Sequence, residues 1–310
     1  MKRFASVLLG ALALCGALLA SPAAKADTYT QTQYPIVLVH GLLGFDAIGP
    51  VNYWYGIPPA LSSGGAAVYV SQESAVNSSV VRGEQLLQEL LQLQAAYGYT
   101  KFNLIGHSHG GQTVRYVASV RPDLVASVTT VGTPHQGSPV ADAIEAGTSA
   151  TGTTAAVAAV VNALGNFISW VSGGGSLPQD AMGALTSLDT AGAQAFNASY
   201  PAGAPTSPCG QGPASVNGVA YYSAGGTSVL TNVFDLSDPL LGLTSLFFGF
   251  QSNDGLVGQC SSHWGTVLRD DYPWNHLDEV NQSFGLIGWF APDPVAFYRA
   301  QANRLKLQGL

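Results

Sequence analysis

Residues 101–120 read KFNLIGHSHGGQTVRYVASV, and this stretch decides the fold class of the chain. Its first part, residues 101–106, is a short apolar run that predicts a buried strand. Its last part, residues 109–120, predicts a helix that ends before Pro122. Between them lies GHSHG, which matches the pattern G-x-S-x-G. Where a strand leads into a helix, this pattern predicts a sharp turn that exposes a serine at the carboxyl end of a sheet.

The serine of this turn, Ser108, is the predicted nucleophile. The sharp turn strains its backbone, and the flanking glycines let strand and helix approach each other closely. His107 and His109 could instead be metal ligands. However, side chains on either side of a protruding serine do not converge on one point, and no Cys/His cluster accompanies them. We expect the backbone N–H of His109 to help bind an oxyanion.

The segments around this turn alternate between strand and helix. Apolar runs predict the strands, and leucines at helical spacing, with Asn77 or Ser78 as a cap, predict the first helix. The expected elements are strands at 34–40, 101–106, 124–132 and 216–223, and helices at 78–97 and 109–120. This alternation predicts an α/β fold with a mostly parallel sheet and helices on both faces. No internal repeat or linker divides the chain, so a single domain is expected.

A nucleophilic serine needs a base, which follows the nucleophile and the acid in chains with this turn. His135 directly follows the third strand and is expected to be structural. His263 and His276 both lie late enough in the sequence. We favour His276, in PWNHLDEVNQ, because a loop leading into a helix can reach over the end of the sheet, whereas His263 lies beside Cys260.

Two further groups complete the predicted site. For the acid, Asp254 in SNDGLVG precedes the histidine and lies at a turn; Asp235 and Asp238 are the alternatives. The second oxyanion donor is expected in the loop after the first strand. There VHGLLG, residues 39–44, places the N–H of Leu42 beside the serine turn.

The N-terminus has the plan of a secretory signal peptide. Two basic residues precede an apolar run at 7–20 that is too short to span a bilayer, and Ala24-Lys25-Ala26 provides a cleavage site. We expect residues 1–26 to be removed and the catalytic domain to comprise residues 27–310. The predicted location is extracellular.

Composition narrows the functional classes. The formal net charge is −7 and no basic block occurs, which argues against nucleic-acid binding. Cys15 leaves with the signal peptide, so Cys209 and Cys260 remain. In an oxidising compartment they suggest one disulfide, with two buried free thiols as the alternative.

No charged residue occurs between Glu145 and Asp180. Within this segment apolar residues recur at helical period from Val157 to Val171, followed by GGGS at 173–176. The helix is either part of the core or a lid, spanning about 138–180, that covers the site in water and opens on lipid.

Long stretches of the chain resemble one family. They are TYTQTQYPIVLVHG, YWYGIP, VRGEQLLQ, NLIGHSHGG, RYVASVRPDL, TPHQGS, NDGLVG and NHLDEVNQSFGL. They resemble the secreted bacterial true lipases, the pseudomonad-type triacylglycerol lipases of the α/β-hydrolase superfamily that depend on a membrane-anchored foldase. The resemblance covers nearly the whole mature chain and aligns least well in the lid segment.

The resemblance implies hydrolysis of long-chain acylglycerols at the oil–water interface by an enzyme that is exported through the periplasm and needs a foldase. We expect a monomer that uses no organic cofactor. It implies a catalytic triad of Ser108, Asp254 and His276, oxyanion donors at Leu42 and His109, and a disulfide between Cys209 and Cys260. It further implies one structural Ca²⁺ held by the carboxylates of Asp235 and Asp278 and the carbonyls of Gln282 and Leu286. The residues alone predict that these two aspartates are exposed acids on the surface. The alternatives are an esterase or polyester hydrolase on the same scaffold and a binding protein without catalytic activity.

Overall fold

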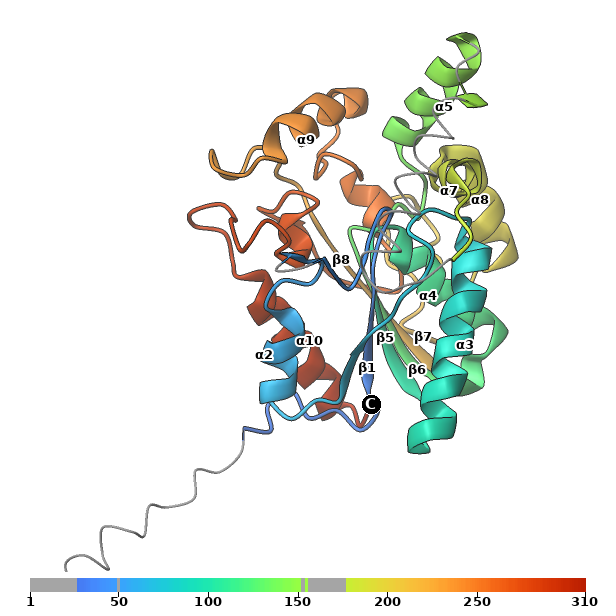
Figure 1. Ribbon diagram of the computed structural model, residues 1–310, viewed down its shortest axis with the longest axis vertical. Helices are drawn as coiled ribbons and strands as arrows, with labels where there is room; N and C mark the ends of the chain where they lie inside the picture. The colour runs from blue at the N-terminus through green and yellow to red at the C-terminus, as the bar shows by residue number, and fades with distance from the viewer. Residues whose placement is uncertain (1–26, 49–50, 152–153, 156–176) are drawn as a thin grey trace, which may run out of the picture.

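A twisted sheet of seven strands forms the centre of the protein (Figure 1). The computed structural model describes residues 27–48, 51–151, 154–155 and 177–310. The strand order is β4-β1-β5-β6-β8-β7, with β9 paired to β8; all pairs are parallel except β7 with β8. The strands are β1 (Ile36–Val39), β4 (Val68–Val70), β5 (Phe102–His107), β6 (Val125–Val131), β7 (Ser215–Val216), β8 (Val219–Gly226) and β9 (Thr266–Tyr272).

Helices cover both faces of this sheet, as the sequence predicts. One face is covered by α3 (Ser79–Tyr97) and α4 (His109–Val120), and the other by α2 (Ile57–Ser63) and α10 (Pro294–Leu307) (Figure 1). Every residue of β1, β5 and β6 is buried, because strands covered on both faces have no solvent side. Two apolar cores result, one between the sheet and α3–α4 and one between the sheet and α2–α10.

The remaining elements lie mostly toward the carboxyl end of the parallel strands (Figure 1). They are the helices α5 (Pro139–Thr151), α7 (Ala181–Leu188), α8 (Thr190–Ser199) and α9 (Asp238–Thr244), the 3₁₀ turns η1 (Pro122–Leu124), η2 (Ser245–Phe248), η3 (Gln259–Ser262) and η4 (Asp278–Val280), and a short ribbon of β2 (Ala47–Ile48) and β3 (Val51–Asn52). Among the described residues, no helix is long and apolar enough to cross a membrane.

Most of the expected elements occur within a residue or two of their predicted bounds. The helix predicted at 109–120 has those bounds, and Ser78 caps α3 by accepting a hydrogen bond from the N–H of Val81. The strand expected at 216–223 is instead a hairpin. Asn217 and Gly218 both adopt positive φ, which is the geometry of a two-residue hairpin turn, so the chain reverses where one strand was expected. The predicted signal peptide and the helical period at 157–171 lie outside the described residues.

Candidate active site

Ser108 lies in the turn between β5 and α4, with φ 55° and ψ −127°. Few non-glycine residues adopt positive φ, and such strain is a feature of functional turns. A Cβ atom at Gly106 would lie 2.3 Å from the carbonyl oxygen of Gly110, and one at Gly110 would lie 2.2 Å from the carbonyl oxygen of Val39. Only glycine therefore allows α4 to pack this closely against β5 and β1.

The loop after β1 lies against this turn. Val39 pairs with Gly106 in the sheet, so β1 and β5 end side by side. Gly41 approaches Ser108 so closely that a Cβ there would lie 2.8 Å from the Cβ of Ser108. Leu42 follows at once and lines the same cavity as Ser108. This arrangement suits the expected oxyanion role of the Leu42 N–H.

The favoured base and acid are in direct contact. Nδ1 of His276 lies 2.8 Å from Oδ2 of Asp254, and both residues are buried. The N–H of His276 also donates to the carbonyl of Asp254 at 2.9 Å. The other carboxylate oxygen of Asp254 accepts hydrogen bonds from the N–H groups of Leu256 and Val257. Because hydrogen bonds hold both of its oxygens, the carboxylate of Asp254 fixes the orientation of the His276 imidazole ring. His276 lines the same cavity as Ser108.

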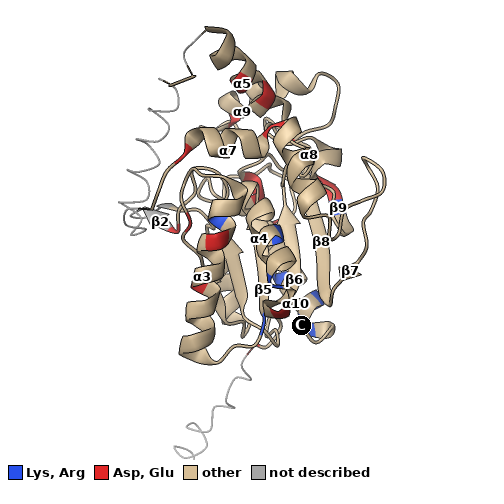
Figure 2. Cartoon of the chain, turned by 90° about the vertical axis from the view of Figure 1, so that its right-hand side faces the viewer, with Lys and Arg blue, Asp and Glu red and all other residues tan. Residues whose placement is uncertain are grey.

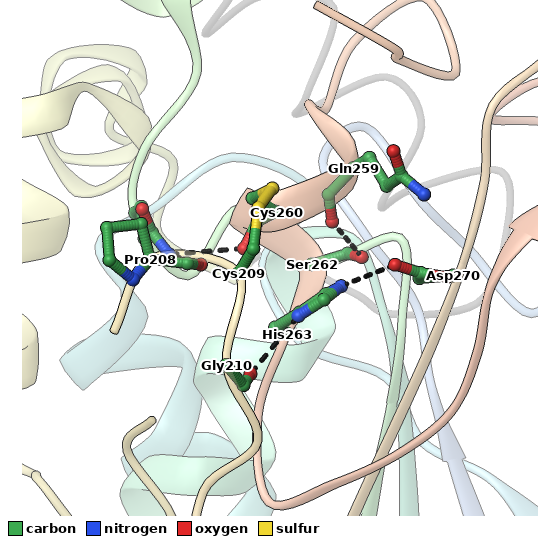
Figure 3. Close-up of a disulfide and its surroundings, with 9 residues drawn as sticks. Pro208, Cys209, Gly210, Gln259, Cys260, Ser262, His263 and Asp270 are labelled. Atoms are coloured by element: carbon green, nitrogen blue, oxygen red, sulfur yellow. Dashed lines mark hydrogen bonds and ion pairs between the residues drawn. A yellow bond between two sulfur atoms is a disulfide. The ribbon is translucent and has the colours of Figure 1, made fainter. Parts of the chain in front are cut away.

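The alternatives for base and acid have other partners. His263 contacts Asp270 through Nε2 at 2.8 Å and the carbonyl of Gly210 through Nδ1, beside the disulfide of Cys209 and Cys260 (Figure 3). It holds the disulfide region and does not approach the serine.

His135 packs on Trp264 and contacts Arg115, so it is structural as expected. Asp238 accepts hydrogen bonds from the N–H groups of Thr231 and Asn232. Asp238 also accepts a hydrogen bond from Nδ2 of Asn275 at 2.8 Å, whereas the carboxylate in contact with Nδ1 of His276 belongs to Asp254.

His107 is part of a buried hydrogen-bond network beneath the site. The Tyr53 hydroxyl accepts from the N–H of Gly41 at 2.9 Å and lies 2.6 Å from Nδ1 of His107. Nε2 of His107 faces two acceptors, so the neutral ring carries its proton there and Nδ1 accepts from the Tyr53 hydroxyl. The remaining ring N–H, at Nε2, then points to the carbonyl of His276 at 3.0 Å and to Oε2 of Glu279 at 3.2 Å. The network links the loop that carries Leu42 to the loop that carries His276.

Glu279 is a site residue that the sequence analysis missed. It is fully buried, its Oε1 accepts from the N–H of Gly226, and its Oε2 lies 3.9 Å from Nδ1 of His276. Burial, together with the nearby Asp254, raises its pKa well above the usual range. Gly132, with φ 51°, makes room for it, since a Cβ there would lie 1.8 Å from Oε2. Its position three residues after His276 is the signal that could have identified it.

His107, His276 and Glu279 each offer one atom within 4.8 Å of the others, a spacing compatible with a metal ion. Both ring nitrogens of His107 already have hydrogen-bond partners, and Nδ1 of His276 contacts Asp254. Burial lowers the pKa of His107 well below its usual value, so the ring is neutral and can serve as both donor and acceptor. The group is therefore better described as a hydrogen-bond network. His109 faces elsewhere, toward the Ser79 hydroxyl.

A second buried cluster supports the loop after β1. Arg82, on α3, donates to the carbonyls of His40 and Ser74 at 2.5 and 2.6 Å. Nε2 of His40 lies 3.4 Å from Glu73, and burial and Arg82 lower the pKa of His40 to about 3. The cluster thus anchors the residue that precedes Gly41.

Ser108 and His276 open into a cavity of about 440 Å³. Its walls come from the loop after β1, from α5 and α7, and from the loops around 256 and 277. Most of the lining residues are apolar, including Leu42, Leu43, Val76, Val140, Ile144, Leu185, Leu188, Leu256, Val257 and Leu277, and none is Asp, Glu, Lys or Arg. The cavity fits an uncharged, apolar group beside a reactive serine.

Two of the predicted calcium ligands are buried carboxylates, and each has one oxygen available to bind an ion. Oδ2 of Asp235 and Oδ1 of Asp278 are buried without a hydrogen-bond partner among the described residues. Burial raises the pKa of Asp278 to about 7, and the negative charges of Asp235 and Asp238 add to the effect. Gln282 and Leu286 follow in the turn after η4. Oxygen donors with this charge fit a divalent cation such as Ca²⁺.

Comparisons with known proteins identify the family and fold of the chain. A family model described as alpha/beta hydrolase fold matches residues 34–249. A triacylglycerol lipase of Vibrio cholerae is 54% identical over 91% of this chain and 90% of its own length. A triacylglycerol lipase of Pseudomonas fragi is 44% identical over 92% of this chain and its whole length. The solved structure of Staphylococcus hyicus lipase, 18% identical, covers 92% of this chain and 99% of its own with a TM-score of 0.62.

Proposed function

Since this chain belongs to the α/β-hydrolase family and is a carboxylic ester hydrolase, we propose that it is a secreted triacylglycerol lipase acting on long-chain acylglycerol esters at the oil–water interface. The observation that carries the proposal is an apolar cavity onto which both Ser108 and His276 open, with Asp254 on Nδ1 of that histidine. Relatives named triacylglycerol lipase that align over most of both chains support it.

In the proposed mechanism, Ser108 Oγ attacks the ester carbonyl while Nε2 of His276 takes its proton. The tetrahedral oxyanion is stabilised by the N–H groups of Leu42 and His109, each of which contributes on the order of 10²- to 10³-fold in rate. His276 returns the proton to the departing alcohol, which leaves an acyl-enzyme at Ser108. Asp254 keeps the Nδ1–H tautomer and stabilises the imidazolium. Water, deprotonated by His276, then releases the fatty acid and restores the serine.

The cavity supports an acylglycerol substrate with an apolar acyl chain. Apart from Tyr53 and His276, its lining carries no ionisable side chain. An acyl chain could be buried there without leaving any charged side chain unpaired, whereas a charged substrate would find no side chain of opposite charge. Removing apolar chain surface from water favours binding in proportion to the area buried.

The lid hypothesis rests on α5, the described part of the region expected at about 138–180. Val140, Ala141 and Ile144 of this helix line the cavity, yet Ile144 remains 45% exposed. In the proposed enzyme, α5 moves to admit lipid, as a helix with an apolar face toward a cavity can. A helix fixed in the core is the competing interpretation.

The proposal includes one structural Ca²⁺, held by the carboxylates of Asp235 and Asp278 and the carbonyls of Gln282 and Leu286. Bound there, the ion would neutralise the two carboxylates and tie the segment after His276 to the segment before α9. No organic cofactor takes part. We further propose that the mature enzyme begins at Asp27, is exported through the periplasm, matures with a dedicated foldase and acts as a monomer.

Hydrolysis of emulsified triolein, measured across the solubility limit of the substrate, tests the function. Wild-type activity is expected to rise once droplets form, and Ser108→Ala and His276→Ala to abolish it. His263→Ala serves as the matched histidine control and is expected to keep turnover on a dissolved ester. Activity confined to dissolved short esters would contradict the lipase proposal and favour an esterase.

A further inference from the structure

Met182 is the only methionine among residues 27–310. It lies on α7 and is half-buried. It also lines the cavity onto which Ser108 and His276 open. The proposed mature chain therefore carries a single thioether, and this thioether belongs to a residue in the wall of the proposed substrate cavity.

The packing of α7 does not require a methionine at this position. The helix presents one face to the cavity, and the other residues on that face are alanine or leucine: Ala181, Ala184, Leu185 and Leu188. Leucine and methionine exchange for one another in apolar surroundings at little cost. What distinguishes Met182 from these neighbours is its chemistry, because a thioether sulfur is polarisable and is oxidised to a sulfoxide.

No free thiol competes with this sulfur. Residues 27–310 contain only two cysteines, Cys209 and Cys260, and these form a disulfide. Cys15 lies in the predicted signal peptide. A mild oxidant that enters the cavity therefore meets one oxidisable sulfur, that of Met182, and the product is methionine sulfoxide.

The cavity determines which oxidants are favoured at this sulfur. None of the described residues that line it is Asp, Glu, Lys or Arg. Helix α7 itself carries no charged residue from Ala181 to Leu188, and it lies near α5 and α9 at one end of the molecule (Figure 2). An apolar molecule gains free energy by burying its surface in such a cavity, whereas hydrogen peroxide has almost no apolar surface to bury. The oxidant that fits is thus an uncharged organic hydroperoxide with an apolar chain.

We propose that Met182 is a modification site, oxidised by hydroperoxide groups that form on unsaturated acyl chains in air. The proposal rests on the proposed function, which places acyl chains in this cavity. A lone pair of the sulfur attacks the outer oxygen of the hydroperoxide, and the O–O bond breaks as the S–O bond forms. The proton of the outer oxygen passes to the leaving oxygen. The peroxide is thereby reduced to an alcohol, the thioether is oxidised to a sulfoxide, and no other reactant is needed.

The sulfoxide changes the cavity wall while leaving the helix in place. It converts an apolar side chain into a polar one, and an acyl chain packed against it offers no hydrogen bond in return. The helix has supports of its own: the Thr186 hydroxyl donates to the carbonyl of Met182 at 2.9 Å, and Asp180 caps α7 by accepting from the N–H of Gly183. We therefore expect weaker binding of long acyl chains in a folded protein, and recovery when the sulfoxide is reduced.

Peptide mass spectrometry tests the modification, using the mature protein with Ser108→Ala so that an ester probe is not cleaved. The oxidants are dissolved methyl linoleate hydroperoxide and hydrogen peroxide, and N-acetyl-methionine amide is the free reference. Relative to hydrogen peroxide, the organic hydroperoxide is expected to favour Met182 about tenfold or more over the reference, because the cavity holds it beside the sulfur. Dissolved oleyl alcohol, which competes for the cavity, should remove this preference.

Matched variants move the sulfur within the same protein. Met182→Leu with Leu307→Met places it on α10, at a side chain that is 78% exposed, and there the organic hydroperoxide should have no preference over the reference. Met182→Leu with Leu185→Met returns the sulfur to the cavity face of α7, one turn further along, and should recover the preference. The two variants contain the same number of methionines, so only the position of the sulfur differs.

Activity gives a second readout, with Ser108 restored and each protein compared with its own untreated sample. Treated wild type is expected to lose roughly tenfold on a long-chain nitrophenyl ester and much less on the acetate ester. A methionine sulfoxide reductase should reverse this loss. Met182→Leu should show no loss on treatment.

The proposal is overturned if Met182 shows no preference for the organic hydroperoxide, or if oleyl alcohol gives no protection. It is equally overturned if a fully oxidised Met182 leaves activity on the long-chain ester unchanged. Failure of the proposed function looks different: the untreated wild type would not hydrolyse triolein, whereas the oxidation of Met182 is measured by mass and needs no turnover.

Discussion

At the scale of single residues, Tyr53 joins the loop of Leu42 to the loop of His276 through His107. Its hydroxyl accepts from Gly41 and donates to His107, which in turn contacts the carbonyl of His276. These three hydrogen bonds join protein groups to one another and can act without contact with the substrate. They set the separation between the loop of the proposed oxyanion donor Leu42 and the loop of the proposed base His276, and small misplacements of catalytic groups are costly in rate.

Tyr53→Phe should therefore lower kcat on a dissolved ester roughly tenfold with little change in KM. It also leaves the buried N–H of Gly41 without its partner, which costs about 1–3 kcal/mol of stability. The control is Tyr69→Phe, which removes a hydroxyl contact with Tyr99 far from the site. Equal kcat in the two variants would show that the Tyr53 hydroxyl has no positioning role.

Glu89 offers a prediction on pH and stability. Burial and the nearby Glu73 raise its pKa in the folded protein from 4.5 to about 8. The unfolded chain ionises this carboxyl near pH 4.5, whereas the folded protein keeps the proton, so stability falls as pH rises from 4.5 towards 8. Glu89→Gln removes this loss. The variant should gain melting temperature relative to the wild type at pH 8, and the gain should shrink at pH 4.5. A gain independent of pH would contradict the assignment.

At the scale of elements, the disulfide restrains two loops rather than the catalytic groups. Cys209 and Cys260, 51 residues apart, join the segment before β7 to η3. Replacing both with serine should destabilise the fold by about 4 kcal/mol in the chain-entropy model. Thermal unfolding would measure this, while kcat at low temperature should be retained. Loss of turnover in a folded variant would mean that η3 supports the acid loop more directly.

The proposed calcium site joins another pair of elements, η4 and the segment before α9. EDTA should lower the melting temperature of the wild type, and added Ca²⁺ should restore it, because an ion that binds only the folded state stabilises it by mass action. Asp278→Asn should abolish this Ca²⁺-dependent shift, whereas Asp293→Asn, at the cap of α10, should preserve it. A melting temperature that EDTA does not change would contradict the proposed calcium site.

The elements that could be predicted from the sequence are those whose signals are local. The turn at Ser108 has its strand, glycines and helix within twenty consecutive residues, and α3 has its cap and leucine spacing in one segment. The edge strand β9 was not predicted, because its side chains are mostly half-exposed and two acids and an arginine interrupt its apolar pattern. Helix α10 was missed for a similar reason, since its buried positions include Gln301 as well as apolar residues.

At the scale of the whole molecule, the site itself is harder to predict than the fold. The pairing of Asp254 with His276 followed from chain order and turn signals. The contacts of His107 did not, because they span 54 residues to Tyr53 and 169 residues to His276. Such contacts exist only after the sheet has brought the loops together. The proposed calcium ligands were likewise available only through family resemblance, since the sequence gives no sign that Asp235 and Asp278 are buried.

The order of the site residues and their supporting elements along the chain matters for biosynthesis. Ser108 is made early, but β9, the loop of His276 and helix α10, which completes one of the two cores, come at the very end. In the proposed mechanism, a nascent or prematurely terminated chain contains the nucleophile without its base. Fragments that end before residue 276 should therefore not hydrolyse esters, and we expect the polypeptide to stay inactive during synthesis until its C-terminal segment packs on the sheet.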